Sequence, residues 1–444
     1  MTFISFSYIC HKFIIMPQKS LLKALGPGIL FASTCIGVSH LVQSTRAGAS
    51  YGFELVVVIL LANLFKYPFF EYASRYANAT GTSIIDGYKR LDKKVLWLYA
   101  GITLLTMFFV SSAVVVVTSG FMSNFIAIIF GIQISGLTSS VILLIICFAV
   151  LVGGKYKLLD SLIKVIGAVL LISTLLAFFL SLSNGGTAPK PESWLNLDLI
   201  FHKDNIGFVI ALMGWMPTAL DLSSWNSLWT VARIKQTGYR PKLKETLFDF
   251  NFGYIISALL ALCFVTLGAN LMYGTGESLP AGSGAFAAKV VEMYTSAIGD
   301  WSKWVIGPAA FCIMFGTAIA VMDGYARSSE RIIELLYLEG KNIDVESRKK
   351  EYILSISILS IITFLIGYFL VFNPDTANLA GFKGLVDIAT TTSFIVAPIV
   401  AIVNFALVQK KYVGKEFVPH KWKQYLSYVG IVFLTGFSIF YLVY

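Results

Sequence analysis

The sequence predicts an all-α protein that crosses a lipid bilayer many times, and three observations support this class. Hydrophobic residues make up 57% of the 444 residues, whereas charged residues make up only 13%. The mean hydropathy is +0.77. A soluble domain carries about 25% charged residues, so this chain lacks the polar surface that water requires. Its apolar runs are continuous rather than alternating, which favours helices over a membrane barrel.

Eleven apolar segments are long enough to cross a membrane, for which about 20 residues are needed. We expect these spans at 26–47, 52–77, 96–130, 137–153, 157–183, 206–232, 248–274, 302–329, 352–373, 383–409 and 424–443. The expected organisation is a cytoplasmic tail over 1–24, a five-helix repeat over 25–183, an external loop over 184–205, a second five-helix repeat over 206–409, and a cytoplasmic loop with helix 11 over 410–444. The natural start is expected at Met1 or Met16.

The basic residues predict how the chain is oriented. With the N-terminus in the cytoplasm, the inner segments hold the basic groups within 12–23, 89–94, 155–157, 233–244, 327–350 and 410–423. The outer segments hold only Arg46, Lys190, Lys203, Lys289, Lys303 and Lys383. Cytoplasmic loops of membrane proteins are enriched in Lys and Arg. This bias therefore supports eleven spans in a plasma (bacterial inner) membrane, with an external C-terminus.

Two of the expected spans contain residues that interrupt a helix. The first span has Gly37, Ser39 and His40 at its middle, and the sixth has Gly214 and Pro217. Proline removes a backbone donor, and glycine costs about 1 kcal/mol relative to alanine inside a helix. Breaks five spans apart predict two inverted repeats whose unwound backbone lines a binding site at mid-membrane. Two ordinary kinks are the alternative, since Gly and Pro are frequent in membrane helices.

Polar residues at membrane depth are candidates for function because their burial is expensive. His40 is the only histidine inside a span, and it could be a ligand, a proton carrier or a neutral side chain bonded to a carbonyl of the broken helix. Asp221 could bind a cation, carry a proton or cap the second half of span 6. Met213 and Met216 flank Gly214, and their thioethers either bind a soft metal ion or simply pack.

Other charged residues inside the spans suggest ion pairs. Glu71 and Arg75 are four residues apart on one helix face and are expected to pair, with Lys66 within reach. A static network is the first interpretation of these three residues, and a gating role is the second. Asp387 in span 10 is expected to be a buried acid that faces a central cavity.

No sequence motif indicates an enzyme. The chain has no phosphate-binding loop, paired-histidine zinc motif or G-x-S-x-G, and its cytoplasmic loops are too short for a nucleotide-binding domain. We therefore expect neither catalysis nor ATP-driven pumping, and we expect no cofactor and no nucleic-acid partner. Any solute that the protein moves must be driven by an ion gradient or pass downhill.

Seven stretches, in order along the chain, are similar to sequences of one protein family. They are LKALGPGIL (22–30), AGASYGFELVVVILLANL (47–64), ASRYANATG (73–81), Met216-Pro217, FDFNFGYIISALLA (248–261), AGSGAF (281–286) and GTAIAVMDGY (316–325). The chain thereby resembles the Nramp family of proton-coupled divalent-metal transporters along most of its length. The resemblance implies the leucine-transporter fold, with eleven helices, two inverted five-helix repeats and broken helices 1 and 6.

The chain departs from this family where the resemblance implies metal binding. The family's helix 1 carries Asp-Pro-Gly-Asn, whereas this chain reads Gly-Val-Ser-His, so that Gly37 replaces the metal-binding Asp and His40 replaces the Asn. The helix 6 methionine is kept as Met216, but the histidines that follow it in the family correspond to Thr218 and Ser223. The acidic residues that the family carries in helix 3 are also absent.

Three functions follow from these observations. The first is import of a divalent transition-metal ion such as Mn or Fe, coupled to protons, and the metal ligands expected for it are His40, Met216 and Asp221. Such a set suits a soft or borderline ion better than Mg²⁺. The second is a transporter of the same fold that carries an amino acid or amine, which the loss of the helix 1 Asp favours. The third is a sensor or scaffold, which the cost of buried charges disfavours.

The metal transporter is the first of these interpretations, and its candidate residues form two groups. The expected substrate contacts are Gly37, Ser39, His40, Met213, Gly214, Met216, Pro217, Thr218 and Asp221. The expected coupling or gating residues are His40, Asp221, Lys66, Glu71 and Asp387.

Overall fold

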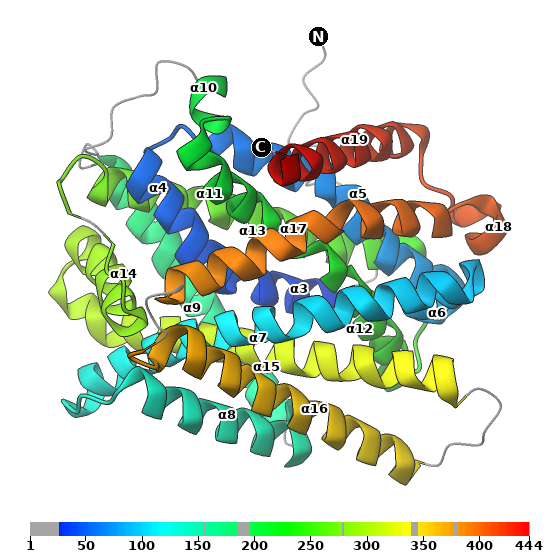
Figure 1. Ribbon diagram of the computed structural model, residues 1–444, viewed down its shortest axis with the longest axis horizontal. Coiled ribbons are helices and arrows are strands. Elements are labelled where there is room, and N and C mark those ends of the chain that lie inside the picture. Colours follow the sequence, from blue (N-terminus) through cyan, green and yellow to red (C-terminus); the bar gives the residue numbers. More distant parts are fainter. Residues whose placement is uncertain are drawn as a thin grey trace.

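A computed structural model gives the structure of residues 26–153, 156–183, 196–277, 279–338, 345–375 and 381–443. Side chains are described throughout these ranges except at 156–167 and 345–349. All regular elements in the described ranges are helices. Figure 1 shows the long helices side by side in one bundle, which confirms the all-α class.

Eight helices are each long and apolar enough to cross a membrane. They are α5 (Val56–Thr80), α7 (Lys93–Phe130), α8 (Gly136–Gly153), α13 (Leu243–Met272), α15 (Lys303–Tyr337), α16 (Val345–Gly367) with η4 (Tyr368–Phe372), α17 (Gly381–Leu407) and α19 (Lys421–Val443). They contain most of the expected spans 2, 3, 4 and 7 to 11. The boundaries differ most for α15, which continues to Tyr337 instead of ending at 329.

The other three expected spans are interrupted or only partly described. Span 1 consists of α3 (Pro27–Cys35), η1 (Ile36–Ser44) and α4 (Thr45–Tyr51), and span 6 consists of α11 (Lys203–Gly214), η2 (Leu220–Leu222) and α12 (Ser223–Thr237). Span 5 corresponds to α9 (Tyr156–Ser183). The count of eleven spans therefore stays a prediction. The tail 1–24, both candidate starts and residues 184–195 of the expected external loop lie outside the described residues.

Short helices lie at the two ends of the bundle. They are α6 (Ile84–Leu91), α10 (Leu197–Ile200), α14 (Ser283–Ile298), η3 (Asp300–Ser302), α18 (Lys410–Val413) and η6 (Lys415–Phe417). Figure 1 places α14 at one end and α6 and α18 at the opposite end. The basic loops predicted to be cytoplasmic belong to the end of α6 and α18.

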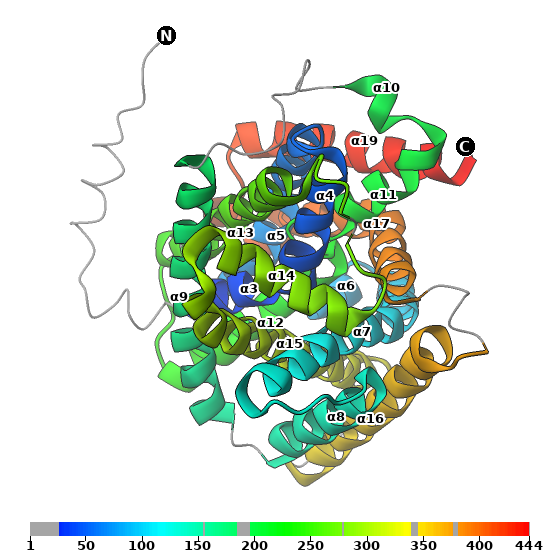
Figure 2. The same ribbon diagram turned by 90° about the vertical axis from the view of Figure 1, so that its left-hand side faces the viewer.

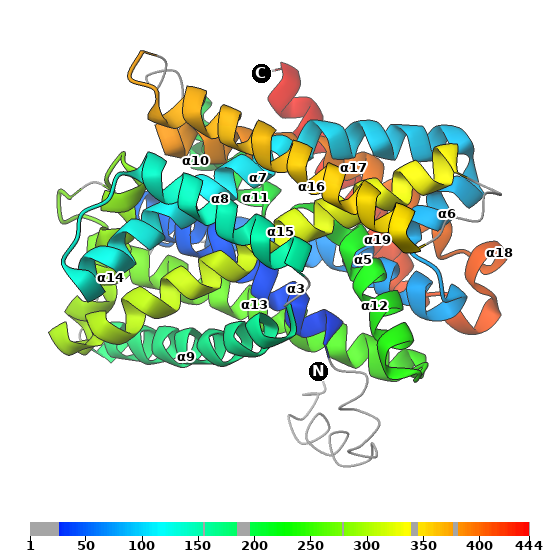
Figure 3. The ribbon, with the colours of Figure 1, turned by 90° about the horizontal axis from the view of Figure 1, so that it is seen from below.

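Helices α8, α16 and α19 form the periphery. Their apolar windows are 33%, 22% and 22% buried, compared with 56–72% for the other five long helices. Figure 1 shows α8 and α16 along one edge of the bundle and α19 along the opposite edge, and Figure 3 shows α8 beside α16. Large apolar side chains such as Ile145, Ile361 and Val432 are exposed there. Exposed apolar surface of this extent matches contact with lipid.

The two broken helices lie against different neighbours in the bundle. Helix α13 packs along α3, η1 and α4, whereas α11 packs on α17 and α12 packs on α5. Figure 2, which looks onto one end of the bundle, shows α4 between α13 and α11. Helix 1 is therefore supported by α13, and helix 6 is supported by α5 and α17.

The start of α3 is held by a carboxylate from α13. The Asp249 side chain accepts hydrogen bonds from the backbone amides of Gly26 at 3.1 Å and Gly28 at 2.6 Å. The first amides of a helix have no intrahelical partner and carry partial positive charge, so a carboxylate stabilises them. This contact fixes the position of broken helix 1 at the end of the bundle where α12 ends.

Candidate functional site

Helix 1 is interrupted at Gly37, as expected. This residue has φ −67° and ψ −126°, outside the helical range. A Cβ at Gly37 would lie 2.6 Å from the side chain of Thr317 on α15, so the close approach of α15 requires glycine. The Ser39 hydroxyl donates to the Cys35 carbonyl, and the Ser44 hydroxyl donates to the Ser39 carbonyl at 3.3 Å. Serine hydroxyls thus satisfy carbonyls in the distorted turn.

Helix 6 is interrupted between Gly214, where α11 ends, and Ser223, where α12 begins. A Cβ at Gly214 would lie only 2.0 Å from the carbonyl oxygen of Thr390 on α17. The unwound stretch contains Met216, whose side chain is fully buried and whose sulfur lies 3.8 Å from the Ser44 hydroxyl of helix 1. Pro217 and Thr218 follow in the same stretch. The η1 stretch of helix 1 therefore touches the unwound stretch of helix 6 inside the bundle.

His40 has partners for both ring nitrogens. Its Nδ1 lies 2.9 Å from the Ser39 hydroxyl, and its Nε2 lies 2.8 Å from the carbonyl oxygen of Ser257 on α13. The side chain is fully buried. In this structure the ring fastens helix 1 to α13, and the expectation that His40 binds a metal or carries a proton stays a prediction.

Replacing His40 by alanine is expected to lower the melting temperature while leaving metal affinity within about threefold of the wild type. The substitution leaves the buried Ser257 carbonyl without its donor, which costs about 1–3 kcal/mol. Thermal melts and calorimetric metal titrations measure the two effects. His420→Ala is the matched control, because that histidine is exposed and its loss is expected to change neither value. A tenfold loss of metal affinity in folded His40→Ala protein would indicate that His40 is a metal ligand.

Asp221 is buried beside α7 and does not cap α12. Asp221 is only 2% exposed and lies in η2. Its Oδ2 accepts a hydrogen bond from Thr106 of α7 at 2.8 Å, whereas its Oδ1 has no hydrogen-bond partner. Tyr325 of α15 donates to the same Thr106 hydroxyl at 3.4 Å. The capping interpretation is therefore wrong, since the recorded partner is a side chain on another helix rather than an amide of α12.

The three residues expected to hold a metal contact different helices. The polar contacts of His40, Met216 and Asp221 are made with α13, η1 and α7 respectively. Within the described part of the chain, no group of three or more His, Cys, Asp or Glu side chains is placed to hold a metal ion.

Lys66 is separate from the ion-pair network that it was expected to join. Glu71 is fully buried and pairs with Arg75 at 2.5 Å, as expected, and also with Lys423 of α19 at 2.7 Å. Lys66 instead donates to backbone carbonyls of Met213, Gly214 and Thr218 in the unwound part of helix 6. Lys66 and Glu71 are five residues apart, which places them on different faces of a helix. Glu71 therefore fastens α5 to a peripheral helix.

Asp387 lies in an ion pair near the end of the bundle that the basic loops predict to be external, rather than buried in a central cavity. Its side chain is 33% exposed, and its two oxygens lie 2.7 and 2.9 Å from the guanidinium nitrogens of Arg46 on α4. Gln43 contacts both residues, at 3.1 Å from Asp387 and 2.8 Å from Arg46. We call Gln43, Arg46 and Asp387 the outer cluster. Nothing in the sequence pointed to Gln43, and Arg46 stood out only as one of few basic residues in segments predicted to be external.

Replacing Asp387 by asparagine is expected to increase access to the breaks from outside by about fivefold. The bidentate pair with Arg46 joins α4 to α17, and about 1 kcal/mol lost from such a pair corresponds to that factor. The reporter is Ser44→Cys, labelled with a membrane-impermeant thiol reagent. Glu277→Gln is the control, because Glu277 pairs with Lys289 of α14. An unchanged labelling rate in the Asp387 variant would show that the outer cluster does not restrict access.

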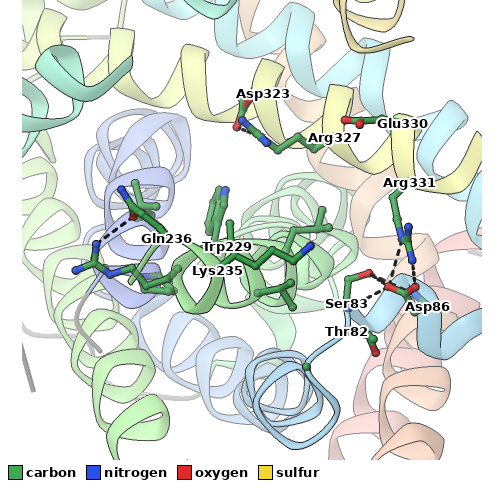
Figure 4. Close-up of a pocket in the computed structure, with 18 of the residues that line it drawn as sticks. Thr82, Ser83, Asp86, Trp229, Lys235, Gln236, Asp323, Arg327, Glu330 and Arg331 are labelled. Carbon is green, nitrogen blue, oxygen red and sulfur yellow. Dashed lines mark hydrogen bonds and ion pairs between the residues drawn. The ribbon is translucent and has the colours of Figure 1, made fainter. Parts of the chain in front are cut away.

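The opposite end of the bundle is hollow. A cavity of about 790 Å³ opens between the start of α3 and parts of α6, α12 and α15. Figure 4 shows Arg331 bonded to Asp86 and Arg327 paired with Asp323, with Trp229 among the residues of α12 that line the cavity. The wall carries charges of both signs. The cavity lies at the end of the bundle that the basic loops predict to be cytoplasmic.

Known structures share this arrangement of helices. A mutant form of the manganese transporter of Eremococcus coleocola superposes with a TM-score of 0.65 over 95% of this chain and 87% of that chain, at 13% sequence identity. The structure of MhsT in complex with L-phenylalanine gives a TM-score of 0.63 over 94% and 97% of the two chains, at 12% identity. These similarities show a leucine-transporter-type fold, with helices 1 and 6 broken as described above.

Sequence relatives identify the family. An uncharacterized protein of Pasteurella multocida is 34% identical over 94% of this chain and 92% of its own length. The divalent metal cation transporter MntH of Levilactobacillus brevis is 20% identical over 95% of this chain and 88% of its own length. The family model described as natural resistance-associated macrophage protein-like matches residues 28–444. The chain is thus an integral membrane protein that belongs to the Nramp family of transporters.

Proposed function

We propose that this protein is a secondary-active transporter that imports a divalent transition-metal ion such as Mn or Fe, coupled to protons. The observation that carries the proposal is the contact between the η1 stretch of helix 1 and the unwound stretch of helix 6, where the Met216 sulfur lies 3.8 Å from the Ser44 hydroxyl. A thioether at such a contact between two broken helices suits a soft or borderline ion. Family membership supports the choice of cargo, because MntH and the Eremococcus coleocola protein are named as divalent-metal and manganese transporters.

The proposed cargo path runs between the breaks. Its walls are the residues of the two unwound stretches, namely Gly37, Ser39, Met213, Gly214, Met216, Pro217 and Thr218. In this proposal the outer cluster closes the path at one end, and the 790 Å³ cavity lies toward the other end of the bundle. We infer that this conformation faces the cytoplasm, with the N-terminus on the same side. Asp221 is the proposed proton carrier, since it is a buried carboxylate with one unpartnered oxygen.

Transport of a small organic solute is a second candidate, and two observations favour it. Gly37 offers no carboxylate to a metal, and the described side chains form no cluster of three metal ligands. MhsT, which has the same fold, was solved with L-phenylalanine. An amino acid or amine could be held by unwound backbone without any metal ligand.

Uptake into proteoliposomes tests the proposal. Vesicles with the purified protein are given labelled Mn²⁺ or Cd²⁺ with and without an inward proton gradient, and labelled amino acids in parallel. The expected result is metal uptake that the gradient accelerates, with Cd²⁺ uptake reduced about tenfold or more in Met216→Leu, since Cd²⁺ favours sulfur ligands. Uptake of a labelled amino acid, without uptake of either metal, would favour the second candidate instead.

A further inference from the structure

A lysine ammonium lies inside the break of helix 6. The Nζ atom of Lys66, on α5, is 2.6 Å from the carbonyl oxygen of Met213, 2.7 Å from that of Gly214 and 3.3 Å from that of Thr218. Lys66 is fully buried. An ammonium group has three hydrogens and accepts nothing. Its three donors therefore match three carbonyls contributed by residues 213–218.

The break itself creates the need for a cation at this position. Helix α11 ends at Gly214, so its last carbonyls lack the regular partner one turn further on, and that of Met213 accepts instead from the amides of Trp215 and Met216. The C-terminal end of a helix also carries partial negative charge. Unwound carbonyls and half-helix ends of this kind bind cations in membrane transporters. Lys66, on the neighbouring helix α5, donates to these carbonyls and brings a positive charge to the end of α11, so no ion from solution is needed.

The lysine has no carboxylate in direct contact. Among the described residues, no Asp or Glu oxygen pairs with Lys66 within 4.0 Å, although Asp221 is close enough to act on it electrostatically. Asp221 itself is bonded to Thr106 on α7. An unpaired buried charge is very costly unless it is fully hydrogen-bonded. The carbonyl oxygens must therefore supply most of what keeps the ammonium in place.

We propose that Lys66 is a tethered cation that fills a carbonyl-lined site for one ammonium-sized monovalent cation at the break of helix 6. The break keeps its shape without an external ion because the lysine occupies this site. A cationic cargo cannot use the carbonyls of Met213, Gly214 and Thr218 while Lys66 is bound to them. Removing the Lys66 side chain leaves the site open, and ammonium, methylammonium or an alkali cation then fits it.

Thermal stability in different salts tests this site, whatever the cargo is, so the result does not depend on the proposed function. Lys66→Ala in choline chloride is expected to melt about 5 °C or more below the wild type, because the buried carbonyls of Met213, Gly214 and Thr218 each lose one donor. Ammonium, methylammonium, Na⁺ or K⁺ chloride is expected to restore at least half of that loss, whereas choline is too large to enter. The wild type is expected to be insensitive to the same exchange of salts.

Two further variants separate the site from general effects of salt. Lys423→Ala also removes a buried lysine, but its partner Glu71 keeps Arg75, so no selective rescue is expected. Lys66→Met serves if the alanine variant does not fold, because it keeps the stem and lacks the charge. The proposal is overturned if the folded Lys66 variants are as stable as the wild type in choline, or if small cations stabilise them no more than they stabilise Lys423→Ala.

Discussion

Replacing Gly214 by alanine is expected to abolish transport and to lower the melting temperature of the purified protein. The added Cβ would lie 2.0 Å from the backbone carbonyl oxygen of Thr390 on α17, and a backbone atom cannot turn aside as a flexible side chain can. Helices α11 and α17 would have to separate. Overpacking of this kind costs about 1–3 kcal/mol or more, and separation would also pull the carbonyls of Met213 and Gly214 away from Lys66.

A second glycine on the same helix provides a matched control. A Cβ at Gly207 of α11 would have no heavy atom within 4 Å, and alanine is favoured over glycine in a helix interior by about 1 kcal/mol. Gly207→Ala is therefore expected to melt no lower than the wild type and to transport normally. Melting curves in detergent and uptake into proteoliposomes measure both variants. Wild-type behaviour of Gly214→Ala would contradict the close packing of α11 on α17.

Replacing Asp221 by asparagine is expected to lower proton-driven uptake by about tenfold or more, which corresponds to about 1.4 kcal/mol in the barrier, and to remove its dependence on pH. Asparagine keeps the size and the acceptor for the Thr106 hydroxyl but cannot exchange a proton. The buried Oδ1 of Asp221 has no hydrogen-bond partner, so a proton can bind there without breaking a hydrogen bond. Initial uptake rates between pH 5.5 and 8 measure the effect.

Two variants show whether the change arises at this carboxylate. Asp204→Asn alters an aspartate whose side chain is 85% exposed, and it is expected to leave the pH profile unchanged. Thr106→Val removes the recorded donor to Asp221 while keeping the carboxylate, and it is expected to displace the profile along the pH axis. If Asp221→Asn keeps the wild-type pH dependence, the proton is carried elsewhere.

The sequence predicted the features that depend on one helix at a time. Long apolar runs predicted the eight helices that are long enough to cross the membrane, because each must reach across the bilayer. Glycines at positions 37 and 214 gave the two breaks, and the four-residue spacing gave the Glu71–Arg75 pair. Each of these predictions rests on local geometry, which is the same in any bundle.

Contacts between distant helices could not be predicted in this way. Lys66 binds carbonyls about 150 positions away, and these carbonyls are available because α11, the first part of helix 6, ends at Gly214. Asp387 pairs with Arg46, which lies 341 positions earlier in the sequence. Periodicity does not say which way a helix face points across the bundle. For the same reason, the depth of His40 in the membrane did not reveal that its ring points to Ser257 of α13.

The central claim, that a soft or borderline metal ion binds where the two breaks meet, is tested most directly by calorimetric titration. Purified wild-type protein and Met216→Leu are titrated with Cd²⁺, Mn²⁺ and L-phenylalanine. The expected result is saturable Cd²⁺ binding that weakens about tenfold or more in Met216→Leu, since the thioether is the soft ligand at this place. Saturable binding of L-phenylalanine, with no heat from either metal, would contradict the claim and make the carrier one for organic solutes.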